Sequence, residues 1–245
     1  RAVRFAAGLE FAIDDATSQA IAARAEELQV VSAERIGAEL RRMLTGADAP
    51  RAVRLMQQHG LLAVVVPELA GADEPTLQHF ADRWPRLATR TLPTTLACLM
   101  LGATSDGAQV TMRAMALKFT RKEAERAGWL VDRYNELAGA DVKPWSTIQP
   151  LLASAGGGEL VAVYEAVAGG PNPASRYCRQ KLALPPDELD PPPLVTGVVL
   201  KQHGLAPGPK FGAWLQAARD AQLNGQIATT VEAVDLITKL QASDD

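Results

Sequence analysis

Residues 1–44 decide the fold, and they read RAVRFAAGLEFAIDDATSQAIAARAEELQVVSAERIGAELRRML. Apolar residues recur in this stretch at the spacing of a helix face, and Asp14 and Ser32 stand where helix N-caps are expected. Arg41 and Arg42 lie in the last turn of the third segment, where positive charge is favoured by the helix dipole. The stretch therefore predicts three helices joined by short links.

The first of these helices begins without a start signal. Arg1, Val3 and Arg4 already belong to an amphipathic segment, and no methionine, cap or leader comes before them. A helix normally needs a cap for its first free N–H groups. We therefore expect the sequence to be part of a longer polypeptide.

The rest of the chain has the same helical period. Apolar positions between residues 73 and 170 recur about every 3.6 residues, and no alternating apolar and polar run is long enough for a strand. Two pairs, Thr120 with Glu123 and Ser146 with Gln149, have the spacing of a capping box. The sequence predicts an all-α chain, an elongated array of helices without a substantial β-sheet.

Composition excludes several classes of protein. The chain has 245 residues and 47% apolar content, which is enough for a packed core. It contains no run of eighteen apolar residues for a membrane span and no export leader, so we expect a cytoplasmic protein. Cys98 and Cys178 lack metal-type spacing and are typical of reduced intracellular thiols.

Positive charge is grouped although the net charge is only −3. Arginine predominates over lysine, and arginine suits bidentate contact with phosphate. The groups are Arg35, Arg41, Arg42, Arg51 and Arg54; Arg113, Lys118, Arg121, Lys122, Arg126 and Arg133; and Arg176, Arg179 and Lys181. Solvated helix faces are the alternative explanation, and both stay open.

The opening stretch carries a family resemblance. RAVRFAAGLEF followed by VSAERIGAELRRML resembles the neck of class II tRNA nucleotidyltransferases and bacterial poly(A) polymerases, and Arg35 and Glu39 match the family's Arg-x-x-x-Glu motif. By the family pattern, Arg1 falls just after the acidic motif that reads the incoming base, so the resemblance implies that this motif and the catalytic head lie outside the sequence. The resemblance implies that Arg1, Arg4, Arg35 and Glu39 form one side of a nucleotide pocket.

The end of the chain resembles the same family's tail. Residues 194–227 read LVTGVVLKQHGLAPGPKFGAWLQAARDAQLNGQI, in which a helix, a glycine and proline turn and a second helix follow one another. N–H groups at the start of a helix hold phosphate well. The predicted RNA-binding residues are Lys201, His203, Gly208, Lys210 and Arg219. An ordinary turn between helices is the alternative.

The sequence also predicts an organisation. The expected parts are a neck-like region at 1–69, a helical body at 70–184 and a helical tail at 194–245. The prolines of residues 185–193 cannot continue a helix and predict an extended connector between body and tail. In the family, the head transfers AMP or CMP from ATP or CTP with Mg²⁺. The chain itself is expected to hold no cofactor, to bind tRNA or an RNA 3′ end and to be inactive alone. CCA addition and poly(A) addition both stay open.

Two other functions remain as alternatives. One is a helical protein-interaction module. The other is an inactive phosphohydrolase-like body, because TLACLMLGATS has Leu101 and Gly102 where that family has a His-Asp pair. His79 and Asp82 share a helix face there, but two ligands do not make a metal site. His59 is interpreted as a helix-end residue that bonds the last carbonyls.

The four tryptophans could stack on bases, but their positions in the sequence favour packing in the core. Trp84, Trp129, Trp145 and Trp214 are scattered singly along apolar helix faces, and Tyr164 and Tyr177 have the same surroundings. Aromatic rings in RNA-binding proteins stack on bases. Core packing is the interpretation that this scatter favours.

Overall fold

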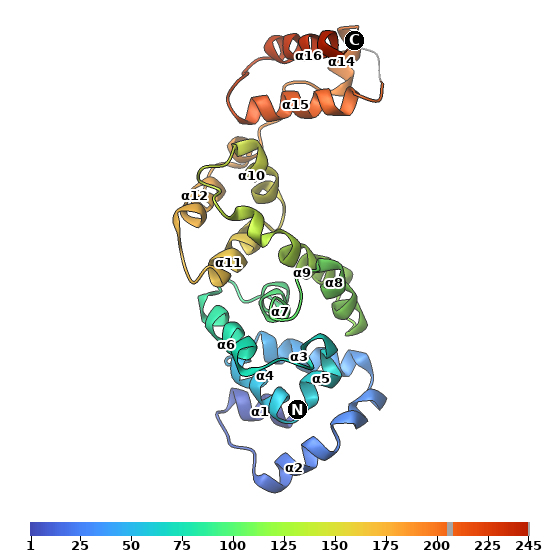
Figure 1. The fold of residues 1–245 in the computed structure, drawn as a ribbon, viewed down its shortest axis with the longest axis vertical. Coiled ribbons are helices and arrows are strands. Elements are labelled where there is room, and N and C mark those ends of the chain that lie inside the picture. Colours follow the sequence, from blue (N-terminus) through green and yellow to red (C-terminus); the bar gives the residue numbers. More distant parts are fainter. Residues whose placement is uncertain (205–207, 245) are drawn as a thin grey trace. The chain divides into compact units, whose positions relative to one another are not determined.

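The computed structural model describes residues 1–204 and 208–244, and every regular element within them is a helix (Figure 1). This confirms the all-α prediction. The chain divides into two compact units, the first formed by Arg1–Leu137 with Glu159–Ser175 and the second by Ala138–Gly158 with Arg176–Asp245. None of the described helices is long and apolar enough to cross a membrane.

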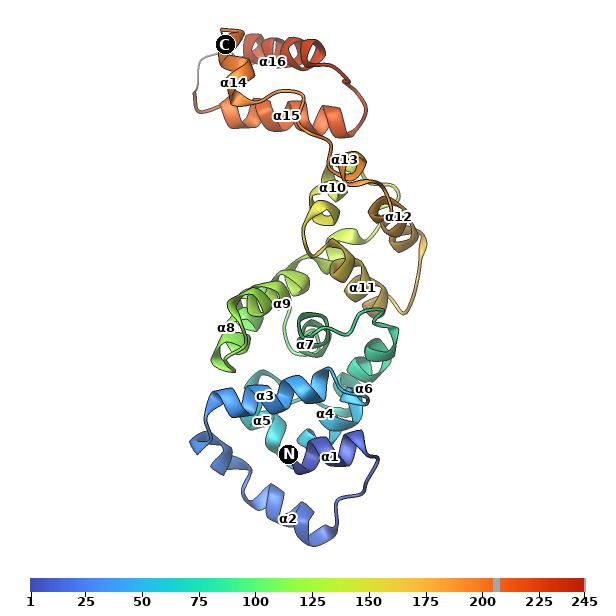
Figure 2. The same ribbon diagram turned by 180° about the vertical axis from the view of Figure 1, so that it is seen from behind.

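The N-terminal helices of the first unit pack around α4. Figures 1 and 2 show α1, α3, α4 and α5 side by side, with α2 outside them. Asp14 accepts a hydrogen bond from the N–H of Thr17 and caps α2, whereas Ser32 stands at the N-cap of α3 without a side-chain bond. The elements are α1 (Ala2–Gly8), α2 (Asp15–Ala23), η1 (Ala25–Val30), α3 (Ala33–Leu44), α4 (Ala49–Gln58), α5 (Leu61–Val65) and η2 (Pro67–Leu69).

His59 ends α4 as the sequence predicts. Its Nδ1 donates to the carbonyl of Leu55 at 2.7 Å, and its Nε2 then accepts from the hydroxyl of Ser18 at 2.9 Å. The ring is buried, and its hydrogen bond with Ser18 connects α2 to the end of α4. Histidine therefore has a structural role here.

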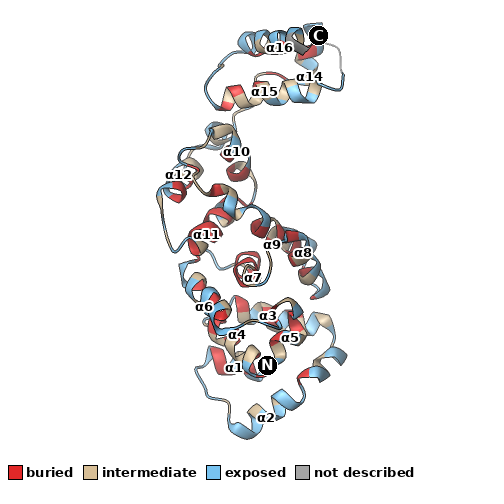
Figure 3. Ribbon diagram, in the orientation of Figure 1, coloured by how far each residue is buried: buried red, intermediate tan, exposed pale blue. Residues whose placement is uncertain are grey.

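Helix α7 is the centre of the first unit. All nine of its residues are buried, which Figure 3 shows in red, because its sequence LPTTLACLM is apolar on every side. The hydroxyls of Thr94 and Thr95 are satisfied by carbonyls of Thr89 and Thr91. The elements of this part of the unit are α6 (Glu74–Arg83), η3 (Trp84–Arg86), α7 (Leu92–Met100), α8 (Gly107–Ala116), α9 (Arg121–Arg133), η4 (Tyr134–Leu137) and α11 (Gly157–Val167).

Helices α8 and α9 lie backbone to backbone. An added Cβ at Gly107 would collide with the carbonyl oxygen of Gly128, and an added Cβ at Gly128 would collide with that of Gly107. The predicted capping box at the start of α9 is confirmed, since Thr120 Oγ1 accepts from the N–H of Glu123 while the Glu123 carboxylate accepts from the N–H of Thr120.

The second unit contains the C-terminal helices. Its tail core is formed by Val195, Leu200, Ala218, Ala233 and Ile237 from α14, α15, α16 and the segment before them. The helices of this part of the chain are α10 (Trp145–Ala153), α12 (Pro173–Leu182), α13 (Pro186–Leu189), α14 (Gly197–Gln202), α15 (Phe211–Leu223) and α16 (Thr230–Asp244). The start of α16 is capped by Glu232, whose carboxylate accepts from the N–H groups of Ala228 and Thr229.

Two local predictions in this unit are wrong. Ser146 and Gln149 form no capping box, since α10 already begins at Trp145 and the Gln149 amide donates to the carbonyl of Leu189 and the carboxylate of Asp190. The proline-rich connector is not extended throughout, because it includes the single helical turn α13. Pro186 is the first residue of that turn, where proline's fixed φ favours a helix start.

Candidate functional site

An ion cluster joins α1 to α3 at the N-terminal end of the molecule. Arg4 Nε lies 2.7 Å from Glu39 Oε2, and an Arg42 terminal nitrogen lies 2.8 Å from the other carboxylate oxygen. The hydrogen bond from Arg4 lowers the pKa of Glu39, with a smaller contribution from Arg42. Glu39 is therefore held ionised between two cations, and its contact with Arg4 sets how α1 lies against α3.

A cavity of about 800 Å³ opens beside this cluster. Arg1, Arg35 and Glu39 line it, so three of the four residues predicted for a nucleotide pocket share one cavity, and the fourth, Arg4, bonds Glu39. Most of the remaining lining is apolar, with Val3, Ile21, Leu28, Val31, Ile36 and Leu61 among it. An apolar cavity with a few charged groups in its lining is the general form of a small-molecule site.

Helix α2 covers this cavity loosely. It contributes Thr17, Ala20 and Ile21 to the lining, but none of its residues is buried (Figure 3). Few buried contacts mean a low free energy of local opening. We infer that access to the cavity depends on α2.

Arg35 and Glu39 do not bond each other, although their i, i+4 spacing allows it. Both oxygens of Glu39 are already bound by Arg4 and Arg42, while Arg35 is exposed and makes no ion pair with any described residue. Sequence analysis missed Arg42 as a member of this site. Its position three residues after Glu39 is the signal that would have identified it.

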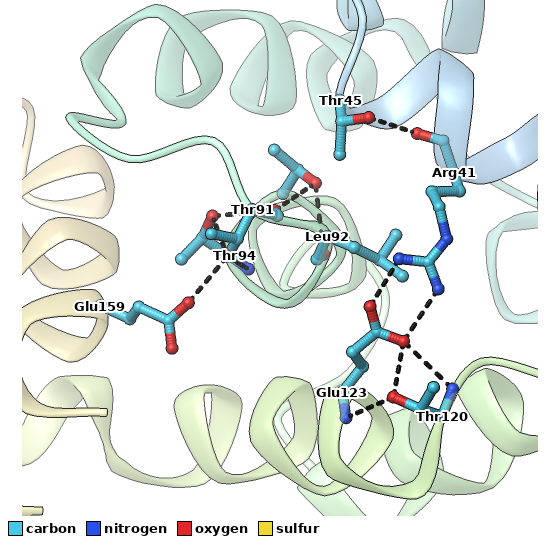
Figure 4. Close-up of polar contacts among 9 residues, drawn as sticks. Arg41, Thr45, Thr91, Leu92, Thr94, Thr120, Glu123 and Glu159 are labelled. Carbon is cyan, nitrogen blue, oxygen red and sulfur yellow. Dashed lines mark hydrogen bonds and ion pairs between the residues drawn. The ribbon is translucent and has the colours of Figure 1, made fainter. Parts of the chain in front are cut away.

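Helix α3 is anchored to α9 by a second ion pair. Figure 4 shows the guanidinium of Arg41 and the carboxylate of Glu123 facing each other, with two hydrogen bonds of 2.5 and 2.8 Å. The bonds from Arg41 lower the pKa of Glu123 to about 2, and those from Thr120 contribute in the same direction. Gly37 fits against the carbonyl of Leu117 on the same side of α3. The helix that carries Arg35 and Glu39 is thus fixed at two points.

The predicted RNA-binding residues of the tail fall into two groups. Lys201 and His203 lie at the end of α14, Lys210 precedes α15, and these residues and Gly208 are exposed. Thr196 caps α14 through the N–H of Val199. Leu205, Ala206 and Pro207 of the predicted turn lie outside the described residues. The two helix ends at residues 203 and 210 therefore both carry basic side chains.

Arg219 has a different environment. Its guanidinium lies 2.7 Å from the Asp190 carboxylate and 2.6 Å from the carbonyl of Pro191, and it also donates to Gln222. These bonds hold the proline-rich segment against α15. Its role in RNA binding stays a prediction.

The residues that would suggest a phosphohydrolase body do not converge. His79 is exposed, Asp82 accepts a hydrogen bond from Gln78, and Gly102 packs close to Thr76. Within residues 1–204 and 208–244 there is no group of three or more His, Cys, Asp or Glu side chains placed to share a metal ion.

Comparisons with known proteins agree on one family. Residues 10–72 match the family described as "Probable RNA and SrmB-binding site of polymerase A". Over 237 residues the chain is 30% identical to the CCA-adding enzyme of Geobacillus stearothermophilus, which covers 96% of this chain and 57% of that protein. It is 28% identical to the CC-adding tRNA nucleotidyltransferase of Thermus thermophilus, covering 95% of this chain and 64% of that protein.

A solved structure has the same fold. The chain matches a CCA-adding enzyme in complex with ATP with a TM-score of 0.63 at 15% identity, over 100% of this chain and 59% of that one. The chain spans little more than half the length of the first of these relatives. Both the sequence and the fold comparisons extend over nearly all of this chain. Over nearly its whole length the chain is therefore similar to part of the tRNA nucleotidyltransferases, and its N-terminal region matches an RNA-binding family of polymerase A.

Proposed function

We propose that this chain is the RNA-binding portion of an enzyme that adds nucleotides to the 3′ end of tRNA. The observation that carries the proposal is the match of 96% of the chain to a CCA-adding enzyme, with the N-terminal region matching an RNA-binding family. In this function, the exposed basic residues at the ends of α14 and α15 contact the tRNA backbone without reading its sequence.

The cavity lined by Arg1, Arg35 and Glu39 forms one side of the nucleotide pocket in this proposal. We assign the contact with the incoming nucleotide to Arg35, because its charge is not bound by a carboxylate of the described residues. Arg4 and Arg42 hold Glu39 in position. ATP and CTP are the nucleotides that the family implies.

The residues that the structure describes contain no group of three or more His, Cys, Asp or Glu side chains that could hold a metal ion. We therefore assign Mg²⁺ and the transfer of the nucleotide to a catalytic part of the family that these residues do not supply. The chain alone is expected to leave the 3′ end of tRNA unchanged when it is incubated with ATP, CTP and Mg²⁺.

Filter binding of tRNA at two salt concentrations tests the function. Phosphate contacts release counterions, so two contacts predict about ten-fold weaker binding at 200 mM than at 50 mM salt. The Lys201→Ala, Lys210→Ala double variant is expected to bind more weakly at 50 mM salt and to show a smaller salt dependence.

Lys239 supplies the matched control, because it is an exposed lysine on α16 of the same unit. Lys239→Ala is expected to bind tRNA like the unchanged chain. If the chain does not bind tRNA at either salt concentration, the proposal fails. That outcome would favour the alternative of a helical protein-interaction module.

A further inference from the structure

Two aromatic rings and a lysine meet on the surface of the second unit. Trp145 is the first residue of α10, and Tyr177 and Lys181 lie one turn apart on α12. The two rings are 6.2 Å apart and nearly perpendicular, and the Lys181 ammonium lies 4.7 Å from the Trp145 ring centre and 5.4 Å from that of Tyr177. We call these three residues the aromatic corner. All three are partly exposed, so the corner reaches the surface.

Positive charge at the corner is not neutralised by carboxylates. Neither Lys181 nor the exposed Arg176 on the same helix forms an ion pair with a described residue. In the first unit, by contrast, most arginines of the two basic groups are bound by glutamate; these pairs include Arg41–Glu123, Arg42–Glu39, Arg54–Glu74, Arg113–Glu68, Arg121–Glu125 and Arg126–Glu159. Two cations of α12 are therefore available for an anion, Lys181 at the corner and Arg176 on the same helix.

The helix start that carries Trp145 is held in place. The N–H of Ser146 donates to the side-chain oxygen of Asn224 at 3.0 Å, and the amide of Asn224 donates to the Ser146 hydroxyl at 3.1 Å. Cys178 and Ile148, which follow Tyr177 and Trp145 closely in sequence, are fully buried. Because its supports are fixed, the corner loses little conformational freedom when a ligand binds.

We propose that the aromatic corner binds one unpaired nucleotide of an RNA. The base stacks on the Trp145 ring, the Lys181 ammonium moves from the rings to the neighbouring phosphate, and Arg176 contacts the same backbone. A flat ring beside unpaired cations is the combination by which proteins bind single-stranded nucleic acid without a strong sequence preference. The inference rests on the proposed RNA-binding function and adds to it a second contact, to a base.

Short single-stranded RNA separates base stacking from phosphate contact. Fluorescence anisotropy is measured with a labelled octanucleotide and with the same backbone lacking its bases. The unchanged chain is expected to bind the base-bearing RNA about ten-fold more tightly, and Trp145→Leu is expected to abolish that difference. Lys181→Met keeps the apolar part of the side chain but removes its charge. It is expected to weaken the binding of both RNAs and to reduce the salt dependence of the affinity.

Trp129 provides the matched control. It also lies beside a cation, with the Arg126 guanidinium 5.3 Å from its ring centre, but Arg126 is also paired with Glu159. Trp129→Leu is expected to keep the preference for base-bearing RNA. Far-ultraviolet circular dichroism identifies any variant that fails to fold. Tyr177→Phe retains both aromatic rings and is expected to keep the preference for base-bearing RNA.

The outcomes distinguish the inference from the proposed function. If the unchanged chain does not distinguish the two RNAs, or if folded Trp145→Leu and Lys181→Met variants bind like the unchanged chain, the inference is overturned. The function stands in that case provided that the Lys201 and Lys210 changes weaken tRNA binding. If tRNA and the octanucleotide both fail to bind, the function and the inference fall together.

Discussion

Gly37→Ala is expected to lower the free energy of unfolding of the first unit by about 3 kcal/mol, the upper part of the range for overpacked cores. Gly37 lies inside α3 and is buried, and a Cβ at this position would collide with the carbonyl oxygen of Leu117 and come within 3.4 Å of the Phe119 ring. The oxygen belongs to the backbone and cannot turn away as a side chain does. Chemical unfolding monitored by circular dichroism measures the loss.

The same change is expected to weaken nucleotide binding in a protein that supplies the rest of the pocket. Arg35 and Glu39 flank Gly37 on α3, so a shift of the helix away from Leu117 moves both of them. Gly8→Ala is the matched control, because Gly8 is the last residue of α1 and an added Cβ there meets no atom within 4 Å. Equal stabilities of the two variants would contradict the close packing of α3.

The sequence predicts the helices better than their contacts. Local signals place Asp14 and Thr120 at helix starts, and both cap helices in the structure because each bonds an N–H group only three residues further along the chain. Ser146 and Gln149 have an equally good capping pattern, but tertiary contacts with Asn224 and Asp190 take their hydrogen-bonding groups. The helix begins at Trp145, two residues before the start that a Ser146 cap would give.

The candidate site shows the same limit. The resemblance selects Arg1, Arg4, Arg35 and Glu39, and the structure brings these residues to one cavity and its adjoining ion pair. Periodicity alone could not show that Glu39 bonds Arg4, thirty-five residues away, in place of Arg35 on its own helix. The aromatic corner was missed for the same reason, because Trp145 and Tyr177 are far apart in sequence.

Glu123→Gln is expected to lower the free energy of unfolding at pH 7 by about 2 kcal/mol. Hydrogen bonds from Arg41 hold the pKa of Glu123 at about 2, below its usual value of 4.5. The full shift corresponds to somewhat more than 3 kcal/mol, and partial exposure of both side chains reduces this. Glutamine retains the carbonyl that accepts from Thr120, so the capping box remains and the change isolates the ionic interaction.

The effect of Glu123→Gln on the free energy of unfolding is expected to depend on pH. Because the pKa of Glu123 is lower in the folded chain than in the unfolded one, its contribution is complete above about pH 4.5 and is lost as the pH falls toward 2. The stability difference between the unchanged chain and Glu123→Gln should therefore shrink across that interval. Glu125→Gln, which breaks an exposed pair with Arg121 on the same helix, is expected to leave the unfolding free energy unchanged. A difference that stays constant from pH 5 to pH 2 would show that Glu123 stabilises α3 by shape and not by its charge.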